Sequence, residues 1–154
     1  MAAHNELGKW GEEKAAEYLR SKGYIIRDRD WQYKHCDLDI VAIDEDVKTI
    51  VFVEVKTRST DIFGRPEEAI TLKKIDNVMK TANAYIRFYK LQNLEIRFDS
   101  ISIISADKEN FTLEHNKNVM EPIHRYIYSR KKAIAKRYNK PGQWKTGGWR
   151  TGGW

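Results

Sequence analysis

Apolar residues recur along the chain with two different periods, and the change of period predicts alternating helices and strands. Helical spacing over residues 6–22 predicts an amphipathic helix, and Gly23 fits the position just past its end. Strand-like patterns and a second, longer helical pattern follow at 24–27, 37–43, 49–58, 67–89 (the helix), 94–105 and 111–114. This order of elements predicts a mixed α/β layer structure.

Length and composition narrow the class of protein. The 154 residues fit one principal domain, and the longest apolar runs, of four residues, are too short for a transmembrane helix. The first residues contain no apolar stretch of the signal-peptide type. The one cysteine, Cys36, excludes an internal disulfide and a cysteine-based zinc site. We therefore expect a cytoplasmic protein without a membrane partner.

The positive charge is concentrated at the end of the sequence. The net charge is +6, yet residues 122–154 carry nine lysines and arginines and no acidic residue, so residues 1–121 sum to −3. We expect an α/β domain over 1–121 and a basic extension over 122–154, helical at first and flexible in its Gly-Gly repeats. Basic arms often bind nucleic acid, and Trp144 and Trp149 are candidates for stacking on unpaired bases. A solvating arm or an appended segment is the alternative.

Charged residues at the ends of two predicted strands form the most informative pattern. Fourteen residues separate Asp39 from the sequence Glu54-Val55-Lys56. Two carboxylates placed together bind a hard divalent cation, and a lysine beside them can position water or neutralise a phosphate. The pattern therefore indicates metal-assisted phosphodiester cleavage. The alternative is a solvated charged face, since charged residues make up 32% of the chain.

An antiparallel hairpin gives these residues a meeting point. A tight turn at residues 46–47 sets Ile43 opposite Ile50 and Val41 opposite Phe52, which matches apolar residues with apolar ones. The same register places Asp39 opposite Glu54 and Asp37 opposite Lys56. Facing carboxylates repel each other unless a cation lies between or beside them, so this register also favours a cation site.

Several motifs in a fixed order give the chain a family resemblance. They begin with Gly8-Lys-Trp-Gly11-Glu12-Glu-Lys-Ala15 and continue through Asp37-Leu38-Asp39-Ile40-Val41-Ala42. Phe52-Val53-Glu54-Val55-Lys56-Thr57-Arg58 and Gly64-Arg-Pro66-Glu-Glu68-Ala69-Ile70 follow in order. Over residues 8–120 the chain resembles the YraN family of bacterial proteins. That family lies within the PD-(D/E)XK, or restriction-endonuclease-like, nuclease superfamily.

The resemblance implies a fold and a set of site residues. The fold is a central mixed sheet of about four to five strands flanked by helices. By this resemblance, Asp39 and Glu54 correspond to ligands of Mg²⁺ or Mn²⁺, and the carbonyl of Val55 corresponds to an additional ligand. Lys56 corresponds to the catalytic lysine. Glu12 corresponds to a helical glutamate that completes the site. Two departures are that Leu38 precedes Asp39 where the superfamily signature has proline, and that Cys36-Asp37 replaces Gly-Glu.

Other charged residues have weaker assignments. Arg58, Lys73 and Lys74 are candidates for phosphate contacts, with an exposed charged surface as the alternative. Asp99 is expected to anchor its own strand, and His115 to be structural. Three functions follow: a metal-dependent nuclease acting on DNA, a non-catalytic nucleic-acid-binding or assembly module, and an interaction protein. In the third, an edge strand near Phe111 would pair with a second copy to form a homodimer.

Overall fold

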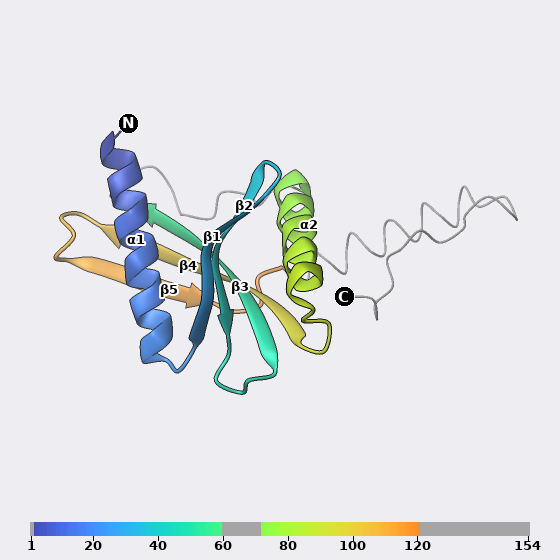
Figure 1. Cartoon of the computed structure of the whole chain (residues 1–154). Helices are drawn as coiled ribbons and strands as arrows, with labels where there is room; N and C mark the ends of the chain where they lie inside the picture. The colour runs from blue at the N-terminus through green and yellow to red at the C-terminus, as the bar shows by residue number, and fades with distance from the viewer. Residues whose placement is uncertain (1, 60–71, 121–154) are drawn as a thin grey trace, which may run out of the picture.

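Figure 1 shows a computed structural model of the chain, which describes residues 2–59 and 72–120. Two helices and five strands follow one another as α1 (Ala2–Ser21), β1 (Ile25–Tyr33), β2 (Cys36–Ile43), β3 (Thr49–Arg58), α2 (Leu72–Tyr89), β4 (Glu95–Ser105) and β5 (Phe111–Asn116). The strands form one sheet in the order β1-β2-β3-β4-β5, parallel between β3 and β4 and antiparallel elsewhere. The mixed sheet flanked by helices confirms the predicted class and is consistent with a restriction-endonuclease-like fold.

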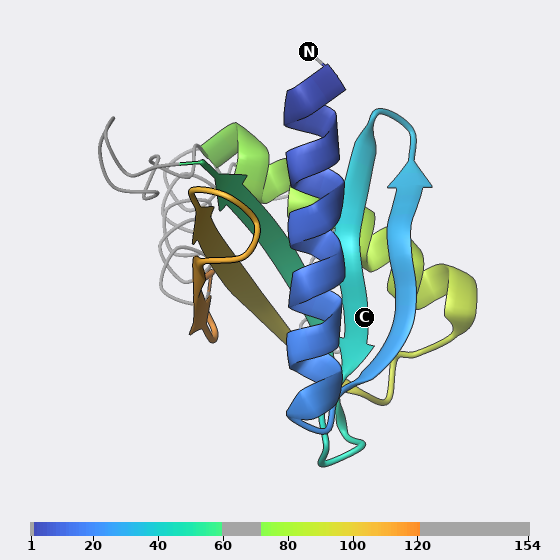
Figure 2. The ribbon, with the colours of Figure 1, turned by 90° about the vertical axis from the view of Figure 1, so that its left-hand side faces the viewer.

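The two helices cover opposite faces of the sheet. Figure 2 shows α1 lying across the near face, with α2 behind the sheet. On one face, α1 packs on alternate residues of β2, β3 and β4 through Ala15, Ala16 and Leu19. On the opposite face, α2 packs on the other residues of the sheet through Ala82, Tyr85 and Ile86. Because both faces are covered, the central strands need apolar residues at consecutive positions, which explains the runs at 40–43 and 50–53.

Glycine shapes α1 at two positions. Gly23 follows the helix with φ +88°, a left-handed conformation, as its predicted place past the end requires. Gly11 is buried at the crossing of α1 over β3, where a Cβ would lie 2.8 Å from the Cβ of Thr57 and closer still to its hydroxyl. A side chain at position 11 would therefore push α1 away from the sheet and displace Glu12 with it.

The glycine contacts lead to a paired prediction. Gly8→Ala meets nothing within 4 Å and improves helix propensity, so the free energy of unfolding should rise by up to about 1 kcal/mol. Gly11→Ala should instead lower it by roughly 1–3 kcal/mol, because the added methyl overpacks the crossing with Thr57. Urea unfolding followed by circular dichroism measures both. Equal stability of the two variants would contradict the close approach at Gly11.

Several boundaries differ from the sequence-based expectations. α1 starts at Ala2 rather than near residue 6, and β1 runs to Tyr33 rather than ending at residue 27. β1 is longer because its polar residues 28–30 lie on an edge strand, where one side of the backbone is open to solvent. The predicted start of the second helix at 67–71 and the extension 122–154, with Trp144 and Trp149, lie outside the described residues. No helix within 2–59 and 72–120 is long and apolar enough to cross a membrane.

Candidate metal and catalytic site

The β2–β3 ladder ends where the predicted site begins. The expected pairs Ile43–Ile50 and Val41–Phe52 form, and the last pair is Ile40–Val53. Beyond it β2 leaves β3, so neither the predicted pairing of Asp39 with Glu54 nor that of Asp37 with Lys56 forms. Asp39 instead accepts a hydrogen bond from the backbone N–H of Val55, at 2.8 Å. The carboxylate thus satisfies a donor at the end of the ladder and is fixed beside β3.

A local break in strand alternation makes room for this contact. Ile40 packs under α1, whereas Leu38, two residues away, packs under α2. On the paired strand, Arg29 bonds Glu13 of α1, while Trp31 packs against Tyr85 of α2. Asp30, between these two residues, has φ 50°. The alternation of side chains between the two faces is therefore broken at Asp30 in β1 and at Asp39 in β2. The prediction that residues 37, 39, 41 and 43 share one face is wrong beyond Asp39.

A cavity of about 260 Å³ lies beside Asp39 and Glu54. Its wall comes from five parts of the fold: the start of β2 with the residue before it, the middle of β3, the first turns of α2, the segment around Phe98, and Met120 after β5. Lys74 and Asn77 line it from α2, opposite the carboxylates of the two strands. This cavity therefore joins the predicted metal ligands to a helix more than fifteen residues further along the chain.

Carboxylates from three elements act on one another around Asp39. The pKa of Asp39 is raised to about 7, first by burial and then by the charges of Glu12, Glu54 and Asp37, while the hydrogen bond from the Val55 N–H acts in the opposite direction. Burial also raises the pKa of Glu12, with the neighbouring Asp30 carboxylate as the next cause. The predicted residues Glu12 and Glu54 thus lie close enough to Asp39 for their charges to raise its pKa.

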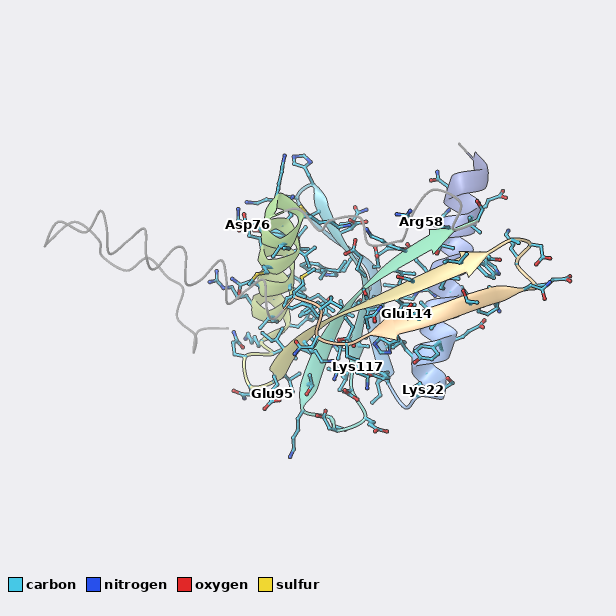
Figure 3. The ribbon with its side chains drawn as sticks, turned by 180° about the vertical axis from the view of Figure 1, so that it is seen from behind. Lys22, Arg58, Asp76, Glu95, Glu114 and Lys117 are labelled. Carbon is cyan, nitrogen blue, oxygen red and sulfur yellow. The ribbon has the colours of Figure 1, made fainter. Side chains whose placement is uncertain are left out.

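The predicted basic residues lie at different distances from this cluster. Lys74 forms an ion pair with Glu54, and Lys73 is exposed on the first turn of α2. Lys56 follows Glu54 by two residues, so both side chains leave the same face of β3. Arg58 is at the end of β3 next to α1, away from Asp76 and the rest of α2 (Figure 3). Arg58 is therefore the most remote of the four from the cavity.

Residues 11–103 match the sequence profile of the uncharacterised protein family UPF0102. The chain belongs to this family. A UPF0102 protein of Bacteroides thetaiotaomicron is 45% identical over 122 residues, which are 79% of this chain and 98% of that protein. Corresponding values are 43% over 118 residues (75% and 94%) for Flavobacterium johnsoniae, and 48% over 104 residues (68% and 89%) for Syntrophomonas wolfei.

UPF0102 is the YraN-like family that the motifs indicated, so this identification is confirmed. The matched residues 11–103 include Glu12, Asp39, Glu54 and Lys56, and they end within β4. The family match therefore covers the strands and helices that build the candidate site. It does not cover the basic extension at 122–154.

The residues of this UPF0102 site fit a hydrated hard cation. Among the described residues, no three His, Cys, Asp or Glu side chains converge to hold an ion by themselves. Mg²⁺ commonly takes only one or two carboxylates and keeps several waters, which suits Asp39 and Glu54. Because N–H and C=O of one strand residue point to the same side, the Val55 carbonyl points to the side of Asp39. The raised pKa of Asp39 indicates charge that a cation would neutralise.

Two residues near the site were not predicted. Asp30 lies beyond the expected end of the first strand, and Asn77 lies on the cavity side of α2. The alternation of Trp31 and Tyr33 with polar residues is the signal that could have extended the strand over Asp30. Nothing in the sequence indicates the Glu54–Lys74 pair, because the two residues are distant in the chain.

Glu13, which is adjacent to Glu12 in α1, makes its contact elsewhere. Its carboxylate accepts a hydrogen bond from Arg29 at 2.6 Å, and this contact lowers the pKa of Glu13. Glu12 and Glu13 thus differ in the direction of their pKa shifts although they are adjacent in α1. Of the two, Glu12 is the one that faces the other carboxylates.

The ion pair at Glu54 leads to a prediction about metal affinity. Lys74 stabilises the Glu54 carboxylate and repels an incoming cation, so Lys74→Gln should tighten Mn²⁺ binding by roughly 2- to 10-fold, the size expected for a partly exposed pair. Lys73→Gln, one residue earlier and exposed, is the matched control and should change little. Calorimetric titration measures both. Weaker Mn²⁺ binding by Lys74→Gln alone would contradict this role.

Proposed function

We propose that this UPF0102 protein is a divalent-metal-dependent nuclease that hydrolyses phosphodiester bonds of DNA in the cytoplasm. The observation that carries the proposal is the partly buried Asp39 carboxyl group, fixed on the Val55 N–H and raised in pKa to about 7 among the carboxylates of Glu54, Glu12 and Asp37. Keeping such a cluster ionised without a counter-ion is unfavourable, because burial and the repulsion between like charges both oppose it. Mg²⁺ or Mn²⁺ is the counter-ion that suits its oxygen ligands.

The chemistry divides among a few side chains. Asp39 and Glu54 would hold the cation, and the Val55 carbonyl would add a third oxygen. The bound cation would supply a Lewis acid for the phosphoryl oxygen and a water of lowered pKa. Lys56 would orient that water or stabilise the negative charge that develops on the phosphate. Glu12 would complete the ligand set or raise the basicity of the cluster.

A substrate panel with a lysine variant tests the proposal. Linear, nicked, branched and single-stranded DNA are incubated with the protein, with and without Mn²⁺, and the products are separated on denaturing gels. We expect metal-dependent cleavage of at least one substrate, and a loss of about 10²–10³-fold in rate for Lys56→Gln. Lys117→Gln, which replaces an exposed lysine beyond the end of β5, should leave the rate unchanged. Metal-independent cleavage, or none on any substrate, would count against the nuclease.

One observation favours a second function, a non-catalytic nucleic-acid-binding or assembly module that retains the nuclease fold. Lys74 already provides Glu54 with a cationic partner within the chain, so this carboxylate has a counter-ion without any metal. In that case DNA would bind with equal affinity in Mn²⁺ and in EDTA, and no substrate of the panel would be cut. Binding measured beside cleavage on the same substrates separates the two functions.

A further inference from the structure

Aromatic side chains form an exposed strip between the edge strand β1 and α2. Phe88 is 71% exposed and Tyr33 39% exposed, and half-buried Trp31 lies between them. The rings of Trp31 and Tyr33 are nearly parallel, with centroids 6.3 Å apart, and Phe88 is 6.4 Å from Trp31. Trp31 also meets Tyr85 edge-on at 5.1 Å, which anchors the strip to the core. We call Trp31, Tyr33 and Phe88 the aromatic strip.

One cation lies over a ring of this strip and another over a ring beside it. The Lys34 ammonium is 5.3 Å from the centre of the Tyr33 ring. The Arg27 guanidinium is 5.3 Å from the ring of half-buried Tyr89, which packs against Phe88 of the strip. Exposed aromatic rings and cations thus lie close to one another between β1 and α2. This combination binds single-stranded nucleic acid, because bases stack on the rings while cations follow the phosphates.

The aromatic strip leads directly to the candidate site. Tyr33 pairs with Cys36 at the end of the β1–β2 hairpin. His35, Cys36 and Asp37, the next residues of that hairpin, line the cavity that holds Asp39 and Glu54. A strand whose bases stack on the strip would therefore have its backbone beside the carboxylates.

We propose that the aromatic strip binds unpaired bases of a single-stranded segment of the DNA substrate. The choice of DNA rests on the proposed function, and the strip narrows the substrate to DNA with a single-stranded end, flap or branch. Duplex bases are stacked on one another, so their faces are not available to Tyr33 and Phe88. The strip therefore selects for the unpaired part of a substrate.

Charge complementarity favours nucleic acid over an apolar protein surface. A protein docked on Phe88 and Tyr33 would bury Lys34 and Arg27 beside it, which is unfavourable unless each charge gains a partner. A phosphate backbone supplies a negative charge for every base that stacks.

Binding to single strands in EDTA tests the strip without cleavage. The affinity of the full-length protein for a labelled single-stranded oligothymidine and for a blunt duplex of equal length is measured by fluorescence anisotropy. Phe88→Ala and Tyr33→Ala should each weaken single-strand binding by roughly 5- to 20-fold and duplex binding much less. Phe111→Ala, an aromatic of similar exposure (40%) on the opposite edge strand β5, is the matched control and should bind as wild type.

A substitution of Lys34 tests whether the cation beside Tyr33 contacts a phosphate. Lys34 has φ 56°, so Lys34→Asn removes the charge and keeps a residue that tolerates this conformation. The slope of log affinity against log salt for the single strand should fall by about 0.7 for the lost phosphate contact. Lys22→Gln is the control. The Lys22 ammonium also lies over a tyrosine ring, 5.7 Å from the centre of Tyr18, but at the C-terminal end of α1 (Figure 3).

The outcomes separate the strip from the nuclease. Wild-type affinity of Phe88→Ala and Tyr33→Ala for the single strand would overturn the inference even if Mn²⁺-dependent cleavage is found. Selective loss of single-strand binding supports it even if no substrate is cut. Equal loss of single-strand and duplex binding would overturn it. So would a dimer, measured by sedimentation, that Phe88→Ala dissociates while DNA binding stays unchanged.

Discussion

Asp39→Asn is expected to abolish Mn²⁺ binding and DNA cleavage while it makes the metal-free protein more stable at neutral pH. The variant keeps an oxygen that can accept the hydrogen bond from the Val55 N–H, so the end of the β2–β3 ladder stays intact. It loses the charge that a cation needs. We expect Mn²⁺ affinity to fall by more than roughly 100-fold, since even residues behind the ligands change affinity by 10- to 100-fold.

The gain in stability follows from the direction of the pKa shift. Asp39 has a pKa of about 7 in the folded protein, against 3.8 for an ordinary aspartate. Ionised Asp39 therefore destabilises the metal-free protein, and stability falls as the pH rises from about 4 to about 7. At about 1.4 kcal/mol for each pKa unit, Asp39→Asn should be more stable than wild type by roughly 2–4 kcal/mol above pH 7. Below pH 4 the difference should disappear.

Denaturant unfolding in EDTA across this pH range measures the effect. Asp46→Asn is a control of opposite sign, because hydrogen bonds from the Lys48 N–H and from Thr49 lower the pKa of this exposed residue. Added Mn²⁺ should raise the melting temperature of wild type and leave that of Asp39→Asn unchanged. A variant that is less stable than wild type at pH 8 and still binds Mn²⁺ would contradict both the electrostatic account and the metal site.

Much of this fold could be predicted because apolar positions determine the strand register. Ile43 and Ile50, and Val41 and Phe52, face each other as the matching of apolar residues requires. A shift by one residue would have moved the side chains that pack under α2 to the face that packs under α1. The same pattern indicated where Asp39 and Glu54 leave the core, and therefore where a site could form. The residues of the site were thus found by the pattern that places the core.

The geometry of the site could not be predicted, because it depends on departures from regular structure. A left-handed residue in a strand, such as Asp30, has no apolar pattern to indicate it. The hydrogen bond from the Val55 N–H to Asp39 forms because the β2–β3 ladder ends at Ile40, the residue next to Asp39. The Glu54–Lys74 pair depends on how α2 packs across the sheet. The local sequence does not indicate which polar side chains from distant parts of the chain will meet.

A second aspartate, Asp99, shows the opposite electrostatic arrangement. It is 1% exposed, and its carboxylate accepts hydrogen bonds from Arg97 at 2.9 and 3.0 Å and from the Asn118 N–H at 3.0 Å. His115 Nε2 lies 2.8 Å from it. Arg97 also donates hydrogen bonds to Asp44, which follows β2, and to the Tyr24 hydroxyl, which precedes β1, so this network joins β4 to β5 and to the chain next to the first two strands. This is the anchoring role expected for Asp99 and the structural role expected for His115.

Asp99→Ala is therefore expected to lower the free energy of unfolding by roughly 3–5 kcal/mol, the loss typical of removing one partner from a buried ion pair. Burial alone would raise the pKa of Asp99, but the hydrogen bonds from His115 and Arg97 hold it below the usual value. Its contribution to stability is thus present above pH 4 and is lost as the pH falls through the lowered pKa, the reverse of Asp39.

Urea unfolding at pH 7 and pH 3 measures the effect of Asp99→Ala, with Glu114→Gln, an exposed neighbour of His115 in β5, as the control. The double variant Asp99→Ala/His115→Ala should lose less than the sum of the single losses, because the two side chains share one contact. Asp99 also borders the cavity, so Mn²⁺ titration distinguishes anchoring from ligation. Reduced Mn²⁺ affinity with unchanged stability would place Asp99 in the metal site, whereas reduced stability with unchanged affinity is the result that the buried network requires.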